Sequence, residues 1–237
     1  MRITEVKDLP TLQDFHAVEE VALAHDHVAL PVDPIEELLP LLEGKMPSGE
    51  HVTLYTGYDD TTPVAALSVT LWTLDNLTSA NVEGYVHPSH RRKGHGRRLM
   101  EHAVDVVRSA GRTRVFLEAP WTRDGEEGPA FPLLRAHGAK PVLDDYRRLL
   151  DLEAFPVTAP PAPPAGYRVV QWADVAPDEL VDGIAYLLHR MVLDAPMGDM
   201  DYEPEKWDAE RYRESEASAM RRNRTRFTTV VVHEETG

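Results

Sequence analysis

A run of basic residues and glycines at positions 86–99 is the part of the sequence best suited to chemistry. It holds five of the 25 Lys and Arg residues, and no Asp or Glu occurs from His87 to Met100, although the chain carries a formal charge of −15. The pattern predicts that a strand ends here, that a turn with Gly94 and Gly96 follows, and that a helix then begins. Free N–H groups at a helix start, with glycines that let the backbone approach closely, bind anions. The segment therefore predicts a phosphate site; the alternatives are a solvated basic helix start or a DNA-binding patch.

The elements expected in the first 152 residues alternate between strands and helices. Period-two or continuous apolar runs predict strands, and apolar residues at helical spacing predict helices. The expected strands are 2–6, 50–58, 64–71, 79–86, 114–119, 141–143 and 146–152, and the expected helices are 12–25, 34–42, 94–110 and 131–137. This order predicts an α/β (α+β) fold, with a mixed, mostly antiparallel central sheet flanked by helices.

A proline-rich segment divides the chain. Residues 156–165 hold five of the 19 prolines and predict an extended, semi-rigid linker. We therefore expect a first domain over 1–155 and a second over 166–237. The second repeats the opening β-α-α-β order of the first, with strands at 167–171 and 226–233 and helices at 177–193 and 204–222.

The basic segment matches a known signature. The pattern V-x-P-x-x-[QR]-x-x-G-x-[GA], with Leu three residues later, is met by Val86, Pro88, Arg91, Gly94, Gly96 and Leu99. It resembles the acetyl-CoA signature of the GNAT N-acetyltransferase superfamily, and the resemblance extends over residues 1 to about 152. The whole chain resembles a tandem GNAT protein of the mycothiol synthase-like arrangement with an incomplete second copy.

The resemblance implies acetyl-CoA as the cosubstrate. Backbone amides from Arg92 through Arg97 would hold the pyrophosphate, and the strand 79–86 would pair with the pantetheine arm near Gly84 to Val86. The residues expected to bind the coenzyme are Gly84, Tyr85, Val86, Arg91, Arg92, Lys93, Gly94, His95, Gly96 and Arg97.

The reaction implied is direct acetyl transfer from the thioester to a primary amine of a small molecule. The amide of Val86 would stabilise the oxyanion. A base must deprotonate the amine, which is mostly ammonium at pH 7. Glu83 is one candidate base, and Glu118 is the alternative.

The sequence departs from the family pattern at two positions. Leu134 stands where many members carry the tyrosine that protonates the thiolate, and Ala80 stands where the glutamate base most often lies. Tyr85 and Tyr146 remain as candidate acids. This departure supports a rival function, a catalytically silent domain that binds acetyl-CoA and stabilises or regulates another copy.

Composition excludes several other classes. A strongly acidic chain is a poor ligand for nucleic acid or anionic membranes. The chain has no cysteine, which excludes disulfides and thiolate zinc sites. It also has no long apolar segment, and the two observations together predict a soluble, cytoplasmic protein. No metal is expected, because the acids and histidines considered as ligands lack a tight ligand spacing (His25, His27, Asp194, Asp199 and Asp201).

The last strand, with an open edge over 227–232, predicts possible homodimer formation.

Overall fold

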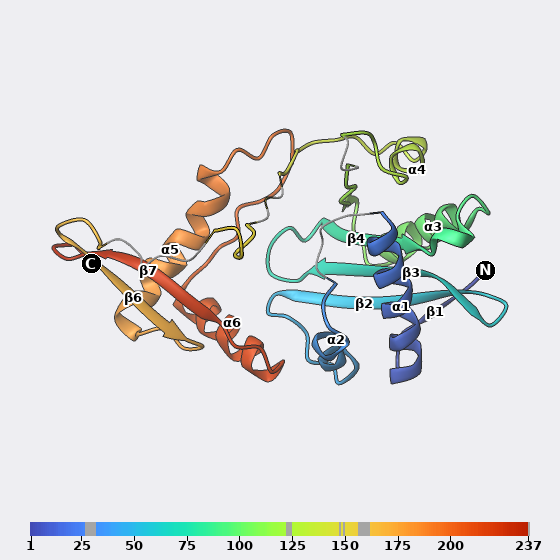
Figure 1. The fold of residues 1–237 in the computed structure, drawn as a ribbon. Helices are drawn as coiled ribbons and strands as arrows, with labels where there is room; N and C mark the ends of the chain where they lie inside the picture. Colours follow the sequence, from blue (N-terminus) through green and yellow to red (C-terminus); the bar gives the residue numbers. More distant parts are fainter. Residues whose placement is uncertain (27–31, 122–124, 147, 149, 156–161, 237) are drawn as a thin grey trace. The chain divides into compact units, whose positions relative to one another are not determined.

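The computed structural model describes residues 1–26, 32–121, 125–146, 148, 150–155 and 162–236 (Figure 1). His27 and much of the proline-rich segment lie outside these residues. The chain divides into two compact units. Unit 1 comprises Met1–Lys140 with Arg221–Arg224, and unit 2 comprises Pro141–Met220 with Thr225–Gly237.

Unit 1 is built on a five-stranded sheet in the order β1-β2-β3-β4-β5. Neighbouring strands are antiparallel except β4 and β5, which are parallel. The strands are β1 (Arg2–Glu5), β2 (Glu50–Asp59), β3 (Thr62–Trp72), β4 (Ser79–Val86) and β5 (Arg114–Phe116). The predicted mixed, mostly antiparallel sheet is confirmed.

Helices cover both faces of this sheet (Figure 1). Because successive side chains of a strand point to opposite faces, Leu67 packs with one group of helical residues and Ala66 with another. Leu67 joins Leu99 of α3 (His95–Ser109) in one apolar cluster. Ala66 joins Phe15 of α1 (Leu9–His25) in the other, against which α2 (Ile35–Leu42) also packs.

Local signals explain where the helices that border the site begin. The Asp8 side chain accepts a hydrogen bond of 2.9 Å from the backbone N–H of Thr11, which caps α1. The connection from β4 to α3 contains the short 3-10 helix η1 (Pro88–His90) and ends on Gly94, whose φ of 86° is left-handed. A further short helix, α4 (Phe131–Ala136), follows β5 in the chain.

Unit 2 contains a two-stranded antiparallel sheet and two helices. They are β6 (Tyr167–Ala173), α5 (Asp178–Asp194), α6 (Ala209–Arg221) and β7 (Phe227–His233). Ala176, Val181 and Tyr212 form its buried centre. Glu216 is also buried there, where it accepts hydrogen bonds from the amide of Ala176 (2.8 Å) and from Arg213 (2.7 Å).

Two predicted strands are wrong in the residues that the structure describes. Residues 141–143 form no strand, and neither do the described residues of 146–152 (147 and 149 lie outside them). Their apolar side chains are largely exposed, from Val142 at 36% to Tyr146 at 76%, so these side chains find no surface to bury them. The helix expected over 204–222 begins later, at Ala209, because the Asp208 side chain accepts a hydrogen bond from the amide of Arg211 and caps it there.

Candidate active site

The turn before α3 presents backbone donors that have no backbone partner among the described residues. The first backbone bond of the helix runs from the amide of Arg98 to the carbonyl of Gly94, so the amides of residues 95–97 precede any intrahelical partner. Gly94 offers no side-chain cap. Arg92 and Gly94 both have positive φ, of 62° and 86°, which is the kind of turn that gathers N–H groups around an anion.

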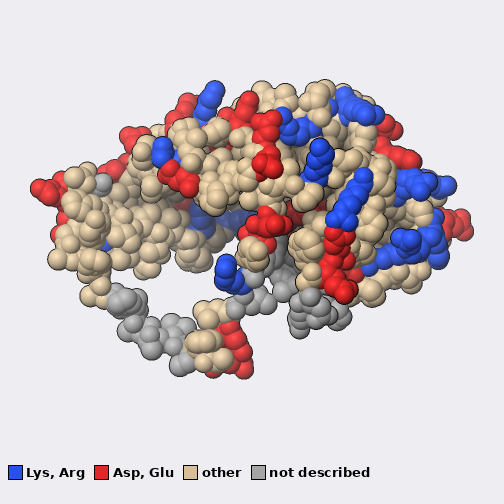
Figure 2. All heavy atoms as spheres, turned by 90° about the horizontal axis from the view of Figure 1, so that it is seen from above, with Lys and Arg blue, Asp and Glu red and all other residues tan. Residues whose placement is uncertain are grey.

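Exposed cations surround this turn. The side chains of Arg92, Lys93 and Arg97 are exposed. On the face shown in Figure 2, basic and acidic side chains lie next to one another, so the formal charge of −15 does not produce a uniformly acidic surface. A local excess of positive charge at positions 91–98 is therefore compatible with the acidity of the whole chain.

Gly96 allows a close approach at the first turn of α3. A Cβ atom built on it would lie 3.1 Å from Cδ2 of Leu133 and 3.9 Å from Cγ2 of Val86. A larger side chain would have to displace these atoms or project into the space beside the free amides. This position thus requires a residue without a side chain, as expected of the second glycine in a phosphate-binding turn.

Arg91 has a different partner from the one predicted. Its guanidinium donates two hydrogen bonds to the carboxylate of Asp26, at 2.6 and 2.8 Å, and its Nε donates to the carbonyl of Val86 at 3.1 Å. Its backbone amide donates to Pro88. Arg91 therefore holds the end of α1 to the end of β4, and its guanidinium positions the turn rather than being free for phosphate.

β4 has an open edge next to the turn. Its pairing with β5 covers Ser79 to Asn81 and ends there, whereas its pairing with β3 continues to Val86. The amide of His87 donates to Val64 on the β3 side. Because backbone groups alternate in direction along a strand, the amides of Val86 and Gly84 point to the other side, the open edge. The N–H predicted to stabilise an oxyanion therefore points into this gap.

Three carboxylates and a phenol gather beside the open edge. Glu83 and Tyr85 project from β4 to the face covered by α1, which contributes Glu19, while Glu118 follows β5. Tyr85 lies close enough to Glu19 and Glu83 for its hydroxyl to interact with both carboxylates, and the Glu83 carboxylate accepts a hydrogen bond of 3.2 Å from the side-chain amide of Asn81. The two predicted bases, Glu83 and Glu118, are close enough for each charge to act on the other.

This crowding of acids changes their proton affinity. Burial, and next the charge of Glu83, raise the pKa of Glu19 to about 7. Partial loss of water, and next the charge of Glu118, raise the pKa of Glu83 above its usual range although part of its side chain remains exposed. Burial raises the pKa of Tyr85 as well, so its hydroxyl stays protonated at neutral pH. A carboxylate that titrates near pH 7 is well matched to act as a general base.

Glu19 was missed by the sequence analysis. It occupies the apolar stripe of α1, seven residues after Leu12 and four after Phe15, both of which are buried. A charged residue in such a stripe is the signal that could have identified it. The ion pair of Asp26 with Arg91 joins residues 65 positions apart, and no local pattern reveals it.

Tyr146 is the predicted acid that stands apart from this cluster in the chain. It lies in unit 2, in a segment without regular structure, and is 76% exposed. Its role therefore stays a prediction, whereas Tyr85 lies close enough to Glu19 and Glu83 to affect the pKa of both carboxylates.

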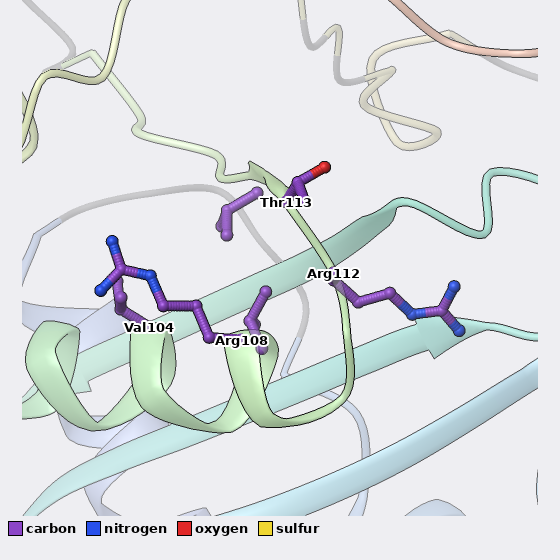
Figure 3. Close-up of a pocket in the computed structure, with 6 residues that line it drawn as sticks. Val104, Arg108, Arg112 and Thr113 are labelled. Atoms are coloured by element: carbon purple, nitrogen blue, oxygen red, sulfur yellow. The ribbon is translucent and has the colours of Figure 1, made fainter.

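A surface hollow elsewhere in unit 1 lacks these features. It lies between the C-terminal half of α3 and the start of β5 and is lined by Val104, Val107, Arg108, Arg112, Thr113 and Val115 (Figure 3). Arg108 and Arg112 point in opposite directions, and Arg112 donates to the carbonyl of Trp72 at 2.8 Å. No carboxylate lines the hollow, so it offers no base for acyl transfer.

The chain belongs to the acetyltransferase (GNAT) family, whose model matches residues 19–138. The matched region contains the turn, the open edge of β4 and the carboxylate cluster. Proteins of this family use acetyl-CoA, and the uncapped amides and Gly96 of this chain suit its pyrophosphate. The predicted family is confirmed.

One solved structure shows the same fold, and two others are similar over part of the chain. A tandem GNAT protein from the clavulanic acid biosynthesis pathway, without AcCoA, aligns with a TM-score of 0.72 at 23% identity, over 100% of this chain and 71% of that chain. A predicted acetyltransferase from Clostridium acetobutylicum with acetyl-CoA gives 0.45 at 14% identity (66% and 99% of the two chains). An aminoglycoside acetyltransferase from an uncultured soil metagenomic sample gives 0.48 at 16% identity (63% and 96%). No curated protein matches the chain.

Proposed function

We propose that unit 1 transfers an acetyl group from acetyl-CoA to a primary amine of a small molecule by direct attack. The observation that carries the proposal is the open edge of β4, which has an anion-binding turn at its end and a cluster of Glu19, Glu83 and Glu118 at its side. The turn suits a diphosphate, and the acids suit a cationic amine. Residues 1–155 would form the catalytic domain.

Acetyl-CoA supplies an activated thioester when it is bound. The amide of Val86 donates a hydrogen bond to the oxygen that becomes negative when the amine nitrogen attacks the carbonyl carbon. Glu19 accepts the proton that the amine loses. Glu83, which accepts a hydrogen bond from Asn81, adds negative charge that favours binding of the ammonium form.

The carbon–sulfur bond then breaks, and the electron pair leaves with the sulfur. A thiolate is a stable enough leaving group to depart without a strong acid, which agrees with the presence of Leu134 where the usual tyrosine would stand. The raised pKa of Tyr85 makes its hydroxyl a weak acid, so departure of the thiolate does not depend on a proton from this residue. Glu118 and Tyr146 remain the alternative base and acid.

Binding and turnover test the proposal separately. Calorimetry should detect one acetyl-CoA per chain in the wild type and no binding in Gly96→Leu, whose side chain would collide with Leu133. Gly183→Ala, in unit 2 with open space around it, is the matched control and should bind as the wild type does. A circular dichroism spectrum unchanged from the wild type would show that the Gly96 variant is folded.

Release of free thiol then distinguishes the two functions. With acetyl-CoA we expect thiol release with primary amines, faster as the number of positive charges on the amine rises, and none with alcohols of the same shape. Binding without thiol release with any amine would favour the rival function, a domain that binds acetyl-CoA without turnover. Absence of binding would contradict both.

Self-association through unit 2 and a cytoplasmic location stay predictions. β7 exposes Phe227 (83%) and Val231 (62%), and β7 pairs with β6. Sedimentation at high concentration tests self-association, and a clean monomer would contradict it. Among the described residues, no helix has the length and apolar character needed to cross a membrane.

A further inference from the structure

Two histidines and an aspartate meet at one edge of the unit 1 sheet. Asp59 ends β2, His90 ends η1, and His95 begins α3. The register explains this meeting: Gly57 of β2, Ala65 of β3 and Val86 of β4 lie in one row across the sheet. The ends of β2 and β4 are therefore at the same edge, and the residues that follow β4 arrive beside Asp59.

The distances within this cluster suit a shared ion. One ligand atom from each of Asp59, His90 and His95 lies within 4.8 Å of the other two. The His95 Nε2 and Asp59 Oδ2 atoms are 3.9 Å apart. Two ligands of a tetrahedral zinc ion, each about 2.1 Å from the metal, are about 3.4 Å apart. Small movements of the side chains would bring the three atoms to coordination distance.

The histidines lack the hydrogen bonds that buried imidazoles need. The His95 side chain is only 7% exposed, and neither of its ring nitrogens has a hydrogen-bond partner among the described residues. Nδ1 of His90 is likewise buried without a partner in this part of the chain. Buried polar atoms are nearly always satisfied, so these unpaired nitrogens indicate a ligand on this side of α3.

An ion pair does not explain the cluster. The separation of 3.9 Å between His95 and Asp59 is too long for a hydrogen bond.

We propose that Asp59, His90 and His95 bind a divalent transition metal ion, with zinc the expected ion. Two imidazole nitrogens and one carboxylate oxygen form a ligand set found in zinc sites, with a water in the fourth position. Calcium and magnesium prefer oxygen ligands only and fit this set poorly. The Asp59 side chain is 53% exposed, which leaves the ion a path from solvent.

The ion would join the end of β2 to the turn before α3. His90 and His95 flank residues 91–94, so metal binding would fix both ends of the phosphate-binding turn. The spacing of the ligands explains why the sequence analysis expected no metal. Asp59 is on β2, 31 residues before His90 of η1, and only the sheet register brings the two residues together. The proposal does not depend on whether unit 1 transfers an acetyl group.

Metal titration of the full chain, without an affinity tag and after chelator treatment, tests the site. Zinc is titrated in competition with a coloured chelator, and cobalt serves as a spectroscopic probe through its visible absorption. We expect one zinc ion per chain and a higher midpoint of thermal unfolding in its presence. Asp59→Asn and His90→Ala should each weaken zinc affinity by at least about 100-fold, since even outer partners of metal ligands contribute about 10- to 100-fold.

Matched controls separate this site from nonspecific binding. Asp60→Asn changes the next exposed acid, and His51→Ala removes an exposed histidine of β2; both should bind zinc as the wild type does. Asp59→Asn alters an exposed side chain and should leave the fold intact, so this variant still tests the site if the His90 variant fails to fold. The proposal is overturned if zinc does not bind at one ion per chain, or if Asp59→Asn binds it as tightly as Asp60→Asn.

Discussion

The two units begin with the same order of elements, but unit 1 continues further than unit 2. Each opens with a strand, two helices and a strand, and in each the two strands pair antiparallel. In unit 1 the second strand continues into β3, β4 and α3, and its Thr56 is fully buried. In unit 2 the described residues form only two strands, and β7 leaves Phe227 83% exposed. The anion-binding turn and the open edge both belong to the part that unit 1 adds.

Each unit also contains a buried or half-buried acid, and the two acids differ in their partners. Glu216 of unit 2 is satisfied by Arg213 and a backbone amide. Glu19 of unit 1 instead faces Glu83, a second acid, and shares Tyr85 with it. The first arrangement stabilises a fold, while the second keeps a carboxyl group ready to exchange a proton at neutral pH. Both acids are at least partly buried, and the difference in their partners separates these roles.

Replacement of Glu19 should produce the largest effect. If Glu19 is the general base, Glu19→Gln should lower kcat by about 10²- to 10⁴-fold, with little change in acetyl-CoA affinity. Glu20→Gln, an exposed neighbour on α1, is the control and should keep wild-type kcat. In the wild type, kcat/KM should rise with pH through an apparent pKa of about 7, and Glu19→Gln should lose this limb. A Glu19→Gln enzyme within about threefold of the wild type would transfer the role to Glu83 or Glu118.

The corresponding change in unit 2 should affect stability alone. Glu216→Ala leaves the amide of Ala176 and the guanidinium of Arg213 without their acceptor, which should lower the free energy of unfolding by about 1–3 kcal/mol. Urea unfolding followed by circular dichroism measures this, with the exposed Glu210→Ala as control. Acetyl-CoA affinity should not change; a loss of affinity would show that unit 2 takes part in binding.

Glu19→Gln should also change how stability depends on pH. The pKa of Glu19 is raised in the folded chain from 4.5 to about 7, so its contribution to stability is full below about pH 4.5 and is lost as pH rises through 7. The side chain at position 19 of the variant cannot become charged, so the variant does not lose this stability. The free energy of unfolding of the variant, relative to that of the wild type, should therefore rise by about 1–2 kcal/mol from pH 5 to pH 8. Urea unfolding at both pH values measures it, and a constant difference would contradict the raised pKa.

Replacement of two helical glycines by alanine should produce the smallest effect, a difference in stability between the two variants. Gly183 of α5 has nothing within 4 Å of an added Cβ, so Gly183→Ala should stabilise the chain by about 0.5–1 kcal/mol. Gly96→Ala places its Cβ 3.1 Å from Leu133 and should give no such gain. Thermal unfolding of the two variants makes the comparison. Equal stabilisation would mean that the first turn of α3 has more room than the structure shows.

Local signals allowed much of unit 1 to be predicted. β4 has the predicted bounds, Ser79–Val86, because its apolar pattern is followed by Pro88, and α3 begins within one residue of the predicted Gly94. The conformation of the turn proposed to bind phosphate could be predicted for the same reason, since a short run of sequence contains all its parts. The strands expected after α4 illustrate the limit: apolar residues at 141–143 indicate a strand, but a strand also needs a partner.

The rest of the candidate site depends on distant residues. Glu19 precedes Glu83 by 64 positions, and the pKa of Glu19 depends on how α1 lies across β4. The basic residue Arg91 matched a signature, yet its guanidinium lies against Asp26, 65 positions earlier. Sequence reasoning identified which residue types could bind the coenzyme, and only the packing of the helices showed which acids interact.

The contact of Arg91 with Asp26 and Val86 has a kinetic consequence. One guanidinium connects Asp26, at the end of the helix that carries Glu19, to the carbonyl of Val86, whose amide is the proposed oxyanion donor. A shift of α1 to admit the amine would therefore also move the end of β4, where the thioester would bind. Loading of donor and acceptor would then be interdependent, and the sequence in which they arrive would influence turnover.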